Sequence, residues 1–335
     1  MSKTKSDYSN LASKINTLYA KDLLKVEAAL KTDISSDVSK VPEISEYLID
    51  SGGKRLRPLL LIVASKLAGY EGGDDHISLG VVVEYIHAAS LLHDDVVDGA
   101  DTRRQIESTN RKFGNEASVL VGDYLFARAF ELMIKLDDLS IAKALSTATK
   151  VLTEGELLQL SNIHNLATSE DQIIETIYRK TGALMEAAVE VGYRLGDNID
   201  PDGIVNLRTY AKNIGIAFQL IDDTLDFTAT TKKWGKPIGA DLIEGKITIP
   251  ILKGYVAAST QDKKFLHDAI NSTVVNEETI LQVKEILEKY GAFESTIALA
   301  KDYVREAKMA LELFGDSIHK ENLKMIGDYL VHRAI

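Results

Sequence analysis

Cysteine is absent from this chain of 335 residues, and proline occurs only five times. The missing thiols exclude disulfides, zinc–thiolate sites and a cysteine nucleophile. Basic residues are outnumbered, 39 Lys and Arg against 50 Asp and Glu: the formal net charge is -11, whereas nucleic-acid-binding proteins need a basic face to meet phosphates. The sequence contains no run of about 18 apolar residues, the length that a membrane-spanning helix needs. Residues 1–7 are not followed by the apolar segment of a signal peptide. We therefore expect a cytoplasmic protein that binds no nucleic acid and has no membrane anchor.

Hydrophobic residues make up 45% of the chain and charged residues 27%, the balance of a globular protein with a substantial core. No proline-rich, glycine/serine-rich or low-complexity stretch divides it. The sequence therefore predicts a single domain over residues 1–335, with residues 1–7 disordered.

Apolar residues recur at spacings of three and four along almost the whole chain, which is typical of helices with a buried face. The predicted helices cover about residues 8–31, 56–69, 76–98, 116–136, 139–163, 170–196, 202–228, 245–258, 263–272, 277–313 with a break near Gly291, and 317–333. No segment alternates convincingly as a strand does. The fold class is therefore all-α. Helices 76–98 and 202–228 are apolar around most of their circumference, so we expect them at the centre of the protein.

Two similar acidic motifs lie towards the C-terminal ends of these central helices. We name their aspartates the first aspartate cluster (Asp94, Asp95 and Asp98) and the second aspartate cluster (Asp222, Asp223 and Asp226). Residues four apart share a helix face, so the first and last aspartates of each cluster project together. Crowded carboxylates repel one another, and their hard oxygen atoms suit Mg²⁺, which a protein holds by one or two carboxylates together with substrate phosphates. A single such motif is most often a solvated helix end, but two in apolar surroundings indicate metal ions shared with a polyanion.

Several cations accompany the first cluster. His87 lies on nearly the same helix face, and Arg103 and Arg104 follow the cluster. Residues 52–58 read Gly-Gly-Lys-Arg-Leu-Arg-Pro and place Lys54 and Arg57 at a helix start, where arginine forks and the helix N-terminus both favour phosphate. Ordinary salt bridges are the alternative for the basic residues, and core packing is the alternative for His87.

Polar residues also accompany the second cluster. Lys180 and Thr181 are adjacent within a predicted helix, Gln219 precedes the cluster by one turn, and Lys236 and Lys246 follow it. A solvated surface position is the alternative for each lysine. Residues 239–247 resemble a nucleotide-binding P-loop, but five residues separate the glycines and isoleucine replaces the hydroxyl residue that would hold Mg²⁺. No strand is predicted before them, so we exclude a P-loop.

Taken in order, these motifs resemble those of the trans-isoprenyl diphosphate synthases along nearly the whole chain. The matching segments are residues 53–58, residues 93–98 with Arg103 and Arg104, residues 180–182, residues 219–226, residues 235–237 and residues 239–246. Residues 113–130 further resemble the long-chain members, which make hexaprenyl to decaprenyl chains for quinones. The resemblance implies a bundle of long antiparallel helices around a central cavity, and an enzyme that condenses an allylic diphosphate with isopentenyl diphosphate.

The resemblance also implies a role for each motif. Both aspartate clusters would bind Mg²⁺, about three ions per site, bridged to the allylic diphosphate. Further contacts with that diphosphate would come from Arg103, Lys180, Lys236 and Lys246, with Thr181 and Gln219 beside it. The catalytic set would be Asp94, Asp95, Asp98, Lys180, Asp222, Lys236 and Lys246. The residues expected at the diphosphate of isopentenyl diphosphate are Lys54, Arg57, His87 and Arg104; Arg333 is a further candidate, with an ordinary surface charge as its alternative. A homodimer is implied, with at most transient membrane contact.

Product length should depend on the space below the first cluster. Ala89 and Ser90 are small where short-chain relatives usually have an aromatic residue, which predicts an open channel and a long product, with octaprenyl as the best estimate. Phe126, Phe130 and Met133 are candidates for its floor, with simple core packing as the alternative. A short-chain farnesyl or geranylgeranyl diphosphate synthase is the alternative product class.

Two other functions compete with this one. A terpene cyclase would usually carry a mixed second metal motif and lack residues 53–58, and a non-catalytic subunit of a heteromeric synthase would commonly lose one aspartate cluster. The chain has both clusters and the basic segment.

Overall fold

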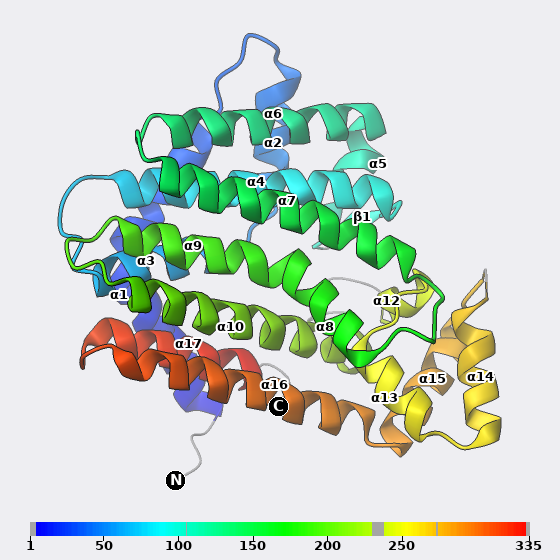
Figure 1. The fold of residues 1–335 in the computed structure, drawn as a ribbon. Coiled ribbons are helices and arrows are strands. Elements are labelled where there is room, and N and C mark those ends of the chain that lie inside the picture. The colour runs from blue at the N-terminus through cyan, green and yellow to red at the C-terminus, as the bar shows by residue number, and fades with distance from the viewer. Residues whose placement is uncertain (1–4, 105, 230–237, 273, 333–335) are drawn as a thin grey trace. The chain divides into compact units, whose positions relative to one another are not determined.

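The computed structural model describes residues 5–104, 106–229, 238–272 and 274–332 (Figure 1). Its helices are α1 (Lys5–Thr32), α2 (Lys40–Asp50), α3 (Leu56–Leu67), α4 (Asp75–Val97), α5 (Thr109–Phe113), α6 (Asn115–Ile134), α7 (Leu139–Ser161), α8 (Glu170–Ile177), the π-helix η1 (Tyr178–Gly182), α9 (Ala183–Arg194), α10 (Pro201–Thr228), α12 (Ala240–Ile243), α13 (Ile249–Ala257), α14 (Thr260–Ile270), α15 (Glu277–Lys289), α16 (Ala292–Ala310), the 3₁₀-helix η2 (Leu311–Leu313) and α17 (Ile318–His332). Two strands, β1 (Thr102–Arg103) and β2 (Ile106–Glu107), pair antiparallel.

The predicted all-α class is confirmed, and so is the break near Gly291, which has φ +65° between α15 and α16. Several features of the described residues differ from the prediction, among them the short helices α5 and α12, which lie between predicted ranges. Helix α2 was not predicted; the β1–β2 pair is too short to show an alternating pattern; and residues 170–196, predicted as one helix, contain the π-helical turn η1. Of residues 1–7, residues 1–4 lie outside the described part and α1 begins at Lys5. The cavity and the single domain stay predictions.

The chain divides into two compact units. Unit 1 comprises residues 1–150, 184–211 and 310–326, and unit 2 comprises residues 151–183, 212–309 and 327–335. The first aspartate cluster belongs to unit 1 and the second to unit 2. Among the described helices, none combines the length and the apolar character needed to cross a membrane.

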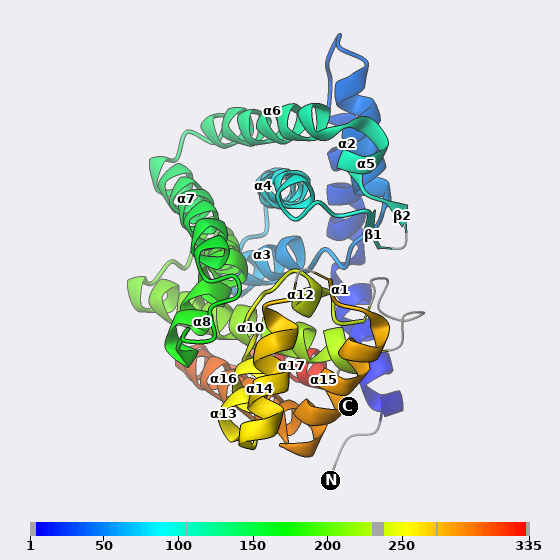
Figure 2. The same ribbon diagram turned by 90° about the vertical axis from the view of Figure 1, so that its right-hand side faces the viewer.

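Helix α4 is the central helix of unit 1. Figure 2 looks almost along it and shows it between α6 and α3, with which it is in contact. It is apolar around most of its circumference, as a helix covered on several sides must be. Glycine permits the approach of α6, because a Cβ atom at Gly122 would lie 2.3 Å from Nε2 of His93. The packing of α4 thus holds the first cluster at the end of a rigid element.

In unit 2, the second cluster lies on the last two turns of α10. Phe227, the neighbour of Asp226, is fully buried, and its ring lies 6.0 Å from that of Phe293 on α16. Helices α13, α14 and α15 pack together (Figure 1). Gly254 on α13 allows close contact with α15, because a Cβ atom there would lie 2.2 Å from Leu287 Cδ2.

Candidate active site

The first aspartate cluster spans the C-terminal end of α4. Asp98 caps the helix, and its N–H donates to the carbonyl oxygen of Asp94 at 2.8 Å, so the two residues keep the four-residue helical spacing. Gly99, with φ +60°, then ends the helix. The three side chains have different environments: Asp94 is half-buried, Asp95 is buried and Asp98 is exposed.

Asp95 is paired with Arg103 of β1. The Arg103 Nε lies 2.8 and 2.9 Å from the two carboxylate oxygens, and its Nη2 lies 2.6 Å from Oδ1. The Asp95 side chain is only 1% exposed, so this contact satisfies a carboxylate that water barely reaches. In this structure Arg103 therefore orients an aspartate of the cluster.

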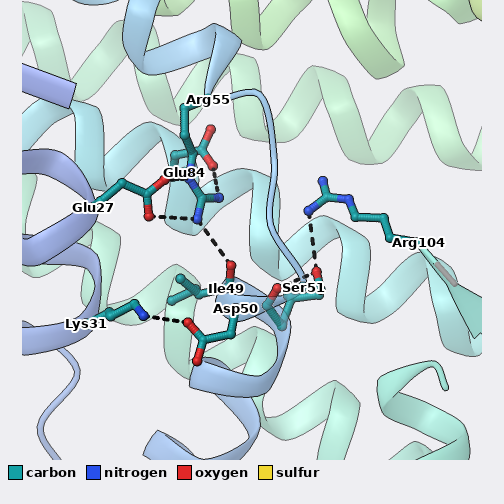
Figure 3. A network of polar contacts seen from close by, with 9 residues as sticks. Glu27, Lys31, Ile49, Asp50, Ser51, Arg55, Glu84 and Arg104 are labelled. Atoms are coloured by element: carbon teal, nitrogen blue, oxygen red, sulfur yellow. Dashed lines mark hydrogen bonds and ion pairs between the residues drawn. The ribbon is translucent and has the colours of Figure 1, made fainter. Parts of the chain in front are cut away.

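The basic segment before α3 is organised around Arg55, a residue that no sequence motif assigned to a substrate (Figure 3). Arg55 has φ +46° and donates to Glu27 of α1, to Glu84 of α4 and to the carbonyl oxygen of Ile49. Burial lowers the pKa of its guanidinium, but the hydrogen bonds and charges of the two glutamates outweigh burial and raise it. The Arg55 guanidinium is thus hydrogen-bonded to protein groups, whereas Lys54, next to it, is exposed to solvent.

Four residues expected at the second diphosphate, Lys54, Arg57, His87 and Arg104, all belong to unit 1. Burial lowers the pKa of His87 well below 6.5, and the charges of Arg57, Arg103 and Arg104 lower it further. Burial also lowers the pKa of Arg57; Glu84 opposes this effect and Arg104 adds to it. Because its pKa is well below 6.5, His87 is neutral at pH 7. The positive charges of the surrounding arginines also act on one another. An anion bound among them would offset their repulsion.

In unit 2, a chain of hydrogen bonds links three predicted residues. The Thr181 hydroxyl donates to Oε1 of Gln219 at 3.1 Å, and Nε2 of Gln219 donates to Oδ1 of Asp223 at 2.9 Å. Asp223 and Thr181 are buried, while Gln219 and Asp222 are half-buried. The structure therefore brings Thr181 to the second cluster, 42 residues before Asp223 in the chain.

Asp226 holds the segment that follows α10. Its Oδ2 accepts a hydrogen bond from the N–H of Asp241 at 3.2 Å, and its carbonyl oxygen accepts from the N–H of Gly239 at 3.0 Å. Asp241 becomes a neighbour of the cluster that was not predicted. Burial raises the pKa of Asp223 well above 3.8, and Asp241, Asp222 and Asp226 add to this effect, whereas the hydrogen bond from Gln219 opposes it.

Lys180 lies in the π-helical turn η1, the kind of irregularity that is frequent at functional sites. Its Nζ lies 2.6 Å from Oε2 of Glu156 and 2.5 Å from Oε1 of Gln159, both on α7. Gly155 allows this approach, because a Cβ atom there would lie 2.9 Å from the Lys180 backbone nitrogen. Sequence reasoning missed Glu156 and Gln159, although a glycine beside two polar residues on one helix face was a visible signal.

Lys246 follows the tight turn at Gly245 and lies 2.5 Å from Oε2 of Glu244. Lys236 and Arg333, two other predicted residues, lie outside the described residues.

The donors fit a hard divalent cation. In the part of the chain that the structure describes, no three His, Cys, Asp or Glu side chains form a ready-made metal site. Mg²⁺ does not require one, since it retains waters and binds through one or two carboxylates plus phosphates. The raised pKa of Asp223 results partly from neighbouring carboxylates, and a cation among them would offset that repulsion.

The residues expected to set product length lie on α4 and α6. Ala89 is fully buried, and Ser90 is buried with its hydroxyl donating to the carbonyl oxygen of His87 at 2.9 Å. Met133 is 2% exposed, whereas Phe130 is 40% exposed. The Phe126 ring lies 5.6 Å from that of His93, beside the first cluster.

Comparison with known proteins identifies the family. The polyprenyl synthetase model matches residues 38–289, well over half of the chain. The chain belongs to the polyprenyl synthetase family. This polyprenyl synthetase is 37% identical to the octaprenyl diphosphate synthase of Escherichia coli over 321 residues, covering 96% of this chain and 98% of the relative. It is 36% identical to a short chain isoprenyl diphosphate synthase of Methanothermobacter thermautotrophicus, covering 86% and 89%.

A solved structure agrees with this assignment. The polyprenyl synthase of Caulobacter crescentus, crystallised with calcium and isoprenyl diphosphate, matches with a TM-score of 0.93 and 38% identity over 97% of this chain and 98% of that one. The polyprenyl synthetase described here is therefore a prenyltransferase with the isoprenoid synthase fold.

Proposed function

We propose that the chain extends an allylic prenyl diphosphate by successive condensations with isopentenyl diphosphate, giving an all-trans long-chain polyprenyl diphosphate for quinone side chains. The observation that supports this most directly is the gathering of Arg57, His87, Arg103 and Arg104 in unit 1, where Arg103 also grips Asp95. Three arginines and a neutral histidine that can donate a hydrogen bond, beside a carboxylate suited to metal binding, are what two diphosphates and a divalent ion require.

Each set of residues has its own proposed task. The first and second aspartate clusters hold the metal ions, about three per site, and Mg²⁺ is the proposed ion because its ligands are all oxygens. Lys180, Lys236 and Lys246, with Thr181 and Gln219, bind the allylic diphosphate, and Arg103 contacts it from the first cluster. Lys54, Arg57, His87 and Arg104 bind isopentenyl diphosphate.

The proposed mechanism begins with loss of the allylic diphosphate. Mg²⁺, when bound, supplies charge stabilisation to the departing pyrophosphate. Lys180, held by Glu156 and Gln159, offers positive charge where negative charge develops. The residues at the second diphosphate hold isopentenyl diphosphate so that its double bond meets the allylic cation, and the proton then released passes to the pyrophosphate. No protein side chain is needed as the base.

Octaprenyl diphosphate is the proposed product. The Escherichia coli relative bears that name, whereas the Methanothermobacter relative is named as a short-chain enzyme at nearly the same identity. The small residues Ala89 and Ser90 favour the longer product, because an aromatic side chain at either position would obstruct a growing chain below the first cluster.

The decisive experiment supplies the purified protein with Mg²⁺, farnesyl diphosphate and labelled isopentenyl diphosphate, and analyses the solvent extract by mass spectrometry. Elongated prenyl diphosphates are expected, and a chelator should abolish them. Combined Asp94→Ala and Asp222→Ala should remove elongation, while Asp302→Ala, which alters an exposed carboxylate on α16, should preserve it. Cyclic hydrocarbons would instead identify a terpene cyclase, and an inactive parent would identify a non-catalytic subunit.

The homodimer and the cytoplasmic location stay predictions. Leu120, Phe130 and Ile134 on α6 are exposed aliphatic or aromatic side chains, which a partner subunit would cover. Transient membrane contact for release of a greasy product also stays a prediction.

A further inference from the structure

The basic segment before α3 contains one cation, Arg55, that the proposed function leaves without a task. Its neighbours Lys54 and Arg57 are the proposed ligands of isopentenyl diphosphate. Arg55 itself is 12% exposed in its side chain and faces protein carboxylates. A charged residue that is buried next to a binding segment requires an explanation, because burying it is unfavourable unless it is paired.

The contacts of Arg55 come from three different helices (Figure 3). Its Nε lies 2.5 Å from Oε1 of Glu27 on α1, and its Nη1 lies 2.9 Å from Oε2 of Glu84 on α4. Its Nη2 lies 3.2 Å from Oε2 of Glu27 and 3.2 Å from the carbonyl oxygen of Ile49 on α2. The guanidinium is a rigid planar fork, so four hydrogen bonds fix its position and orientation closely.

The backbone of Arg55 is strained at the same place. Its φ of +46° and ψ of +39° are left-handed, a conformation that costs a non-glycine residue free energy. This turn directs the chain from Gly53 and Lys54 into the first turn of α3, which carries Arg57. The side-chain bonds to Glu27, Glu84 and Ile49 oppose relaxation of the turn, since a relaxed backbone would move the guanidinium away from all three.

A second arginine lies against the same segment. Arg104 donates to the Ser51 hydroxyl at 3.4 Å, and a Cβ atom at Gly53 would lie 3.3 Å from Nη1 of Arg104 and 3.3 Å from Nη1 of Arg55. The backbone at Gly53 therefore lies close to both guanidinium groups. Movement of Arg55 would alter the segment against which Arg104 packs.

We propose that Arg55, clamped by Glu27 and Glu84, is the positioning residue that holds Lys54, Arg57 and Arg104 in register for the diphosphate of isopentenyl diphosphate. This inference rests on the function proposed above. Arg55 does not touch the diphosphate; it acts through the backbone of residues 53–57. Glu84 contributes as a hydrogen-bond acceptor even though its negative charge lies near an anion site.

The direction in which one substitution changes the KM for isopentenyl diphosphate distinguishes a positioning role from a purely electrostatic role. Glu84→Gln removes a negative charge near the anion site, so an electrostatic role alone would lower the KM for isopentenyl diphosphate. The clamp predicts the opposite, a rise of about tenfold, which corresponds to the loss of one charge-assisted hydrogen bond. Arg55→Lys, which cannot form the fork, should raise the same KM by about tenfold or more.

Both variants are compared with Arg128→Lys. Arg128 on α6 also bridges two acids, lying 2.7 Å from Asp33 and 2.6 Å from Glu131, but it belongs to no proposed binding site. The KM for isopentenyl diphosphate, the KM for farnesyl diphosphate and the thermal midpoint are measured for each protein. We expect the KM for farnesyl diphosphate to stay within about twofold in all three, and Arg128→Lys to keep both parental KM values.

The effects of Arg55→Lys and Glu84→Gln on the KM for isopentenyl diphosphate should also be non-additive, because both substitutions break the same contact. If Glu84→Gln does not fold, Glu27→Gln serves instead, since it leaves the bonds to Glu84 and Ile49; because Glu27 accepts two bonds from Arg55, this change should raise the KM for isopentenyl diphosphate by about tenfold or more. If the wild type is active and its Glu84→Gln or Glu27→Gln variant keeps or lowers that KM, this inference is overturned and the proposed function stands. A wild type that makes no elongated product would overturn both this inference and the proposed function.

Discussion

Asp95 of the first aspartate cluster has a tightly constrained environment. Its side chain is 1% exposed and accepts three hydrogen bonds from one arginine. A buried carboxylate is stable only while such a partner remains, and the same pairing fixes the angle at which it meets a metal ion. The orientation of the carboxylates in the first aspartate cluster therefore depends on Arg103 as well as on the aspartates themselves.

We predict that Arg103→Lys lowers kcat by about tenfold or more and destabilises the protein by about 1–3 kcal/mol, because lysine keeps the charge but cannot form the two-pronged contact with Asp95. Product formation and urea unfolding measure the two effects. Arg305→Lys is the control, since Arg305 pairs with Asp302 on an exposed surface, where such pairs contribute little. A parental kcat in Arg103→Lys would show that the pair does not matter for catalysis.

At the scale of elements, α4 carries both the first aspartate cluster and the small residues beneath it. Ala89 is fully buried on this helix, which contacts α6 along its length. A large side chain at this position has to displace its neighbours or occupy the space through which a product tail would pass.

Ala89→Tyr should therefore shorten the product to about three or four isoprene units, because the phenol ring blocks growth of the chain. Mass spectrometry of the extracted products gives the length distribution. Ala127→Tyr provides the control, since Ala127 is exposed on α6. An unchanged series of products in Ala89→Tyr would refute the assignment of the channel to this face of α4.

A second element-scale feature is the contact of α7 with the π-helical turn η1. We predict that Gly155→Ala lowers kcat by about tenfold and stability by about 1–3 kcal/mol, because the new Cβ atom would collide with the Lys180 backbone and displace this lysine from Glu156 and Gln159. Steady-state kinetics and thermal unfolding test this. Gly315→Ala is the matched control, since a Cβ atom there meets nothing within 4 Å. Equal kcat values for the two variants would argue against a positioning role for α7.

At the scale of the whole molecule, three buried or half-buried histidines couple stability to pH. Burial lowers the pKa of His76, despite opposing charge from Asp22, and burial likewise lowers the pKa values of His87 and His319. The unfolded chain then binds more protons than the folded one between the lowered value and the ordinary value of 6.5.

Stability should accordingly be constant with respect to these groups above about pH 7.5 and fall as the pH decreases through 6.5, by up to about 1.4 kcal/mol for each unit of pKa shift. His76→Gln should reduce the slope of the thermal midpoint between pH 7 and pH 5, because it removes one of these groups. Differential scanning calorimetry across this range measures the slope. His267→Gln, at an exposed position on α14, should leave the slope unchanged; equal slopes for both variants would contradict the prediction.

Helix positions could be predicted from the sequence because they depend on local spacing. The apolar residues of α4 and α10 repeat at three and four along each helix, and this pattern alone predicts that both aspartate clusters lie at the ends of buried helices. Helix α2 was missed, although its apolar residues Ile44, Leu48 and Ile49 follow the same spacing. The β1–β2 pair has two residues in each strand, too few for any period.

The sequence by itself determined the all-α class, the two aspartate clusters and the set of cations around them, since residue types and helical spacing carry that information. Only the tertiary structure decided which cations the protein itself engages: Arg55 by Glu27 and Glu84, Arg103 by Asp95, and Lys180 by Glu156 and Gln159. The physical reason is that Glu27 and Glu84 lie 28 and 29 residues from Arg55 on different helices, and no local period records which side chains the packing of helices brings within hydrogen-bonding distance.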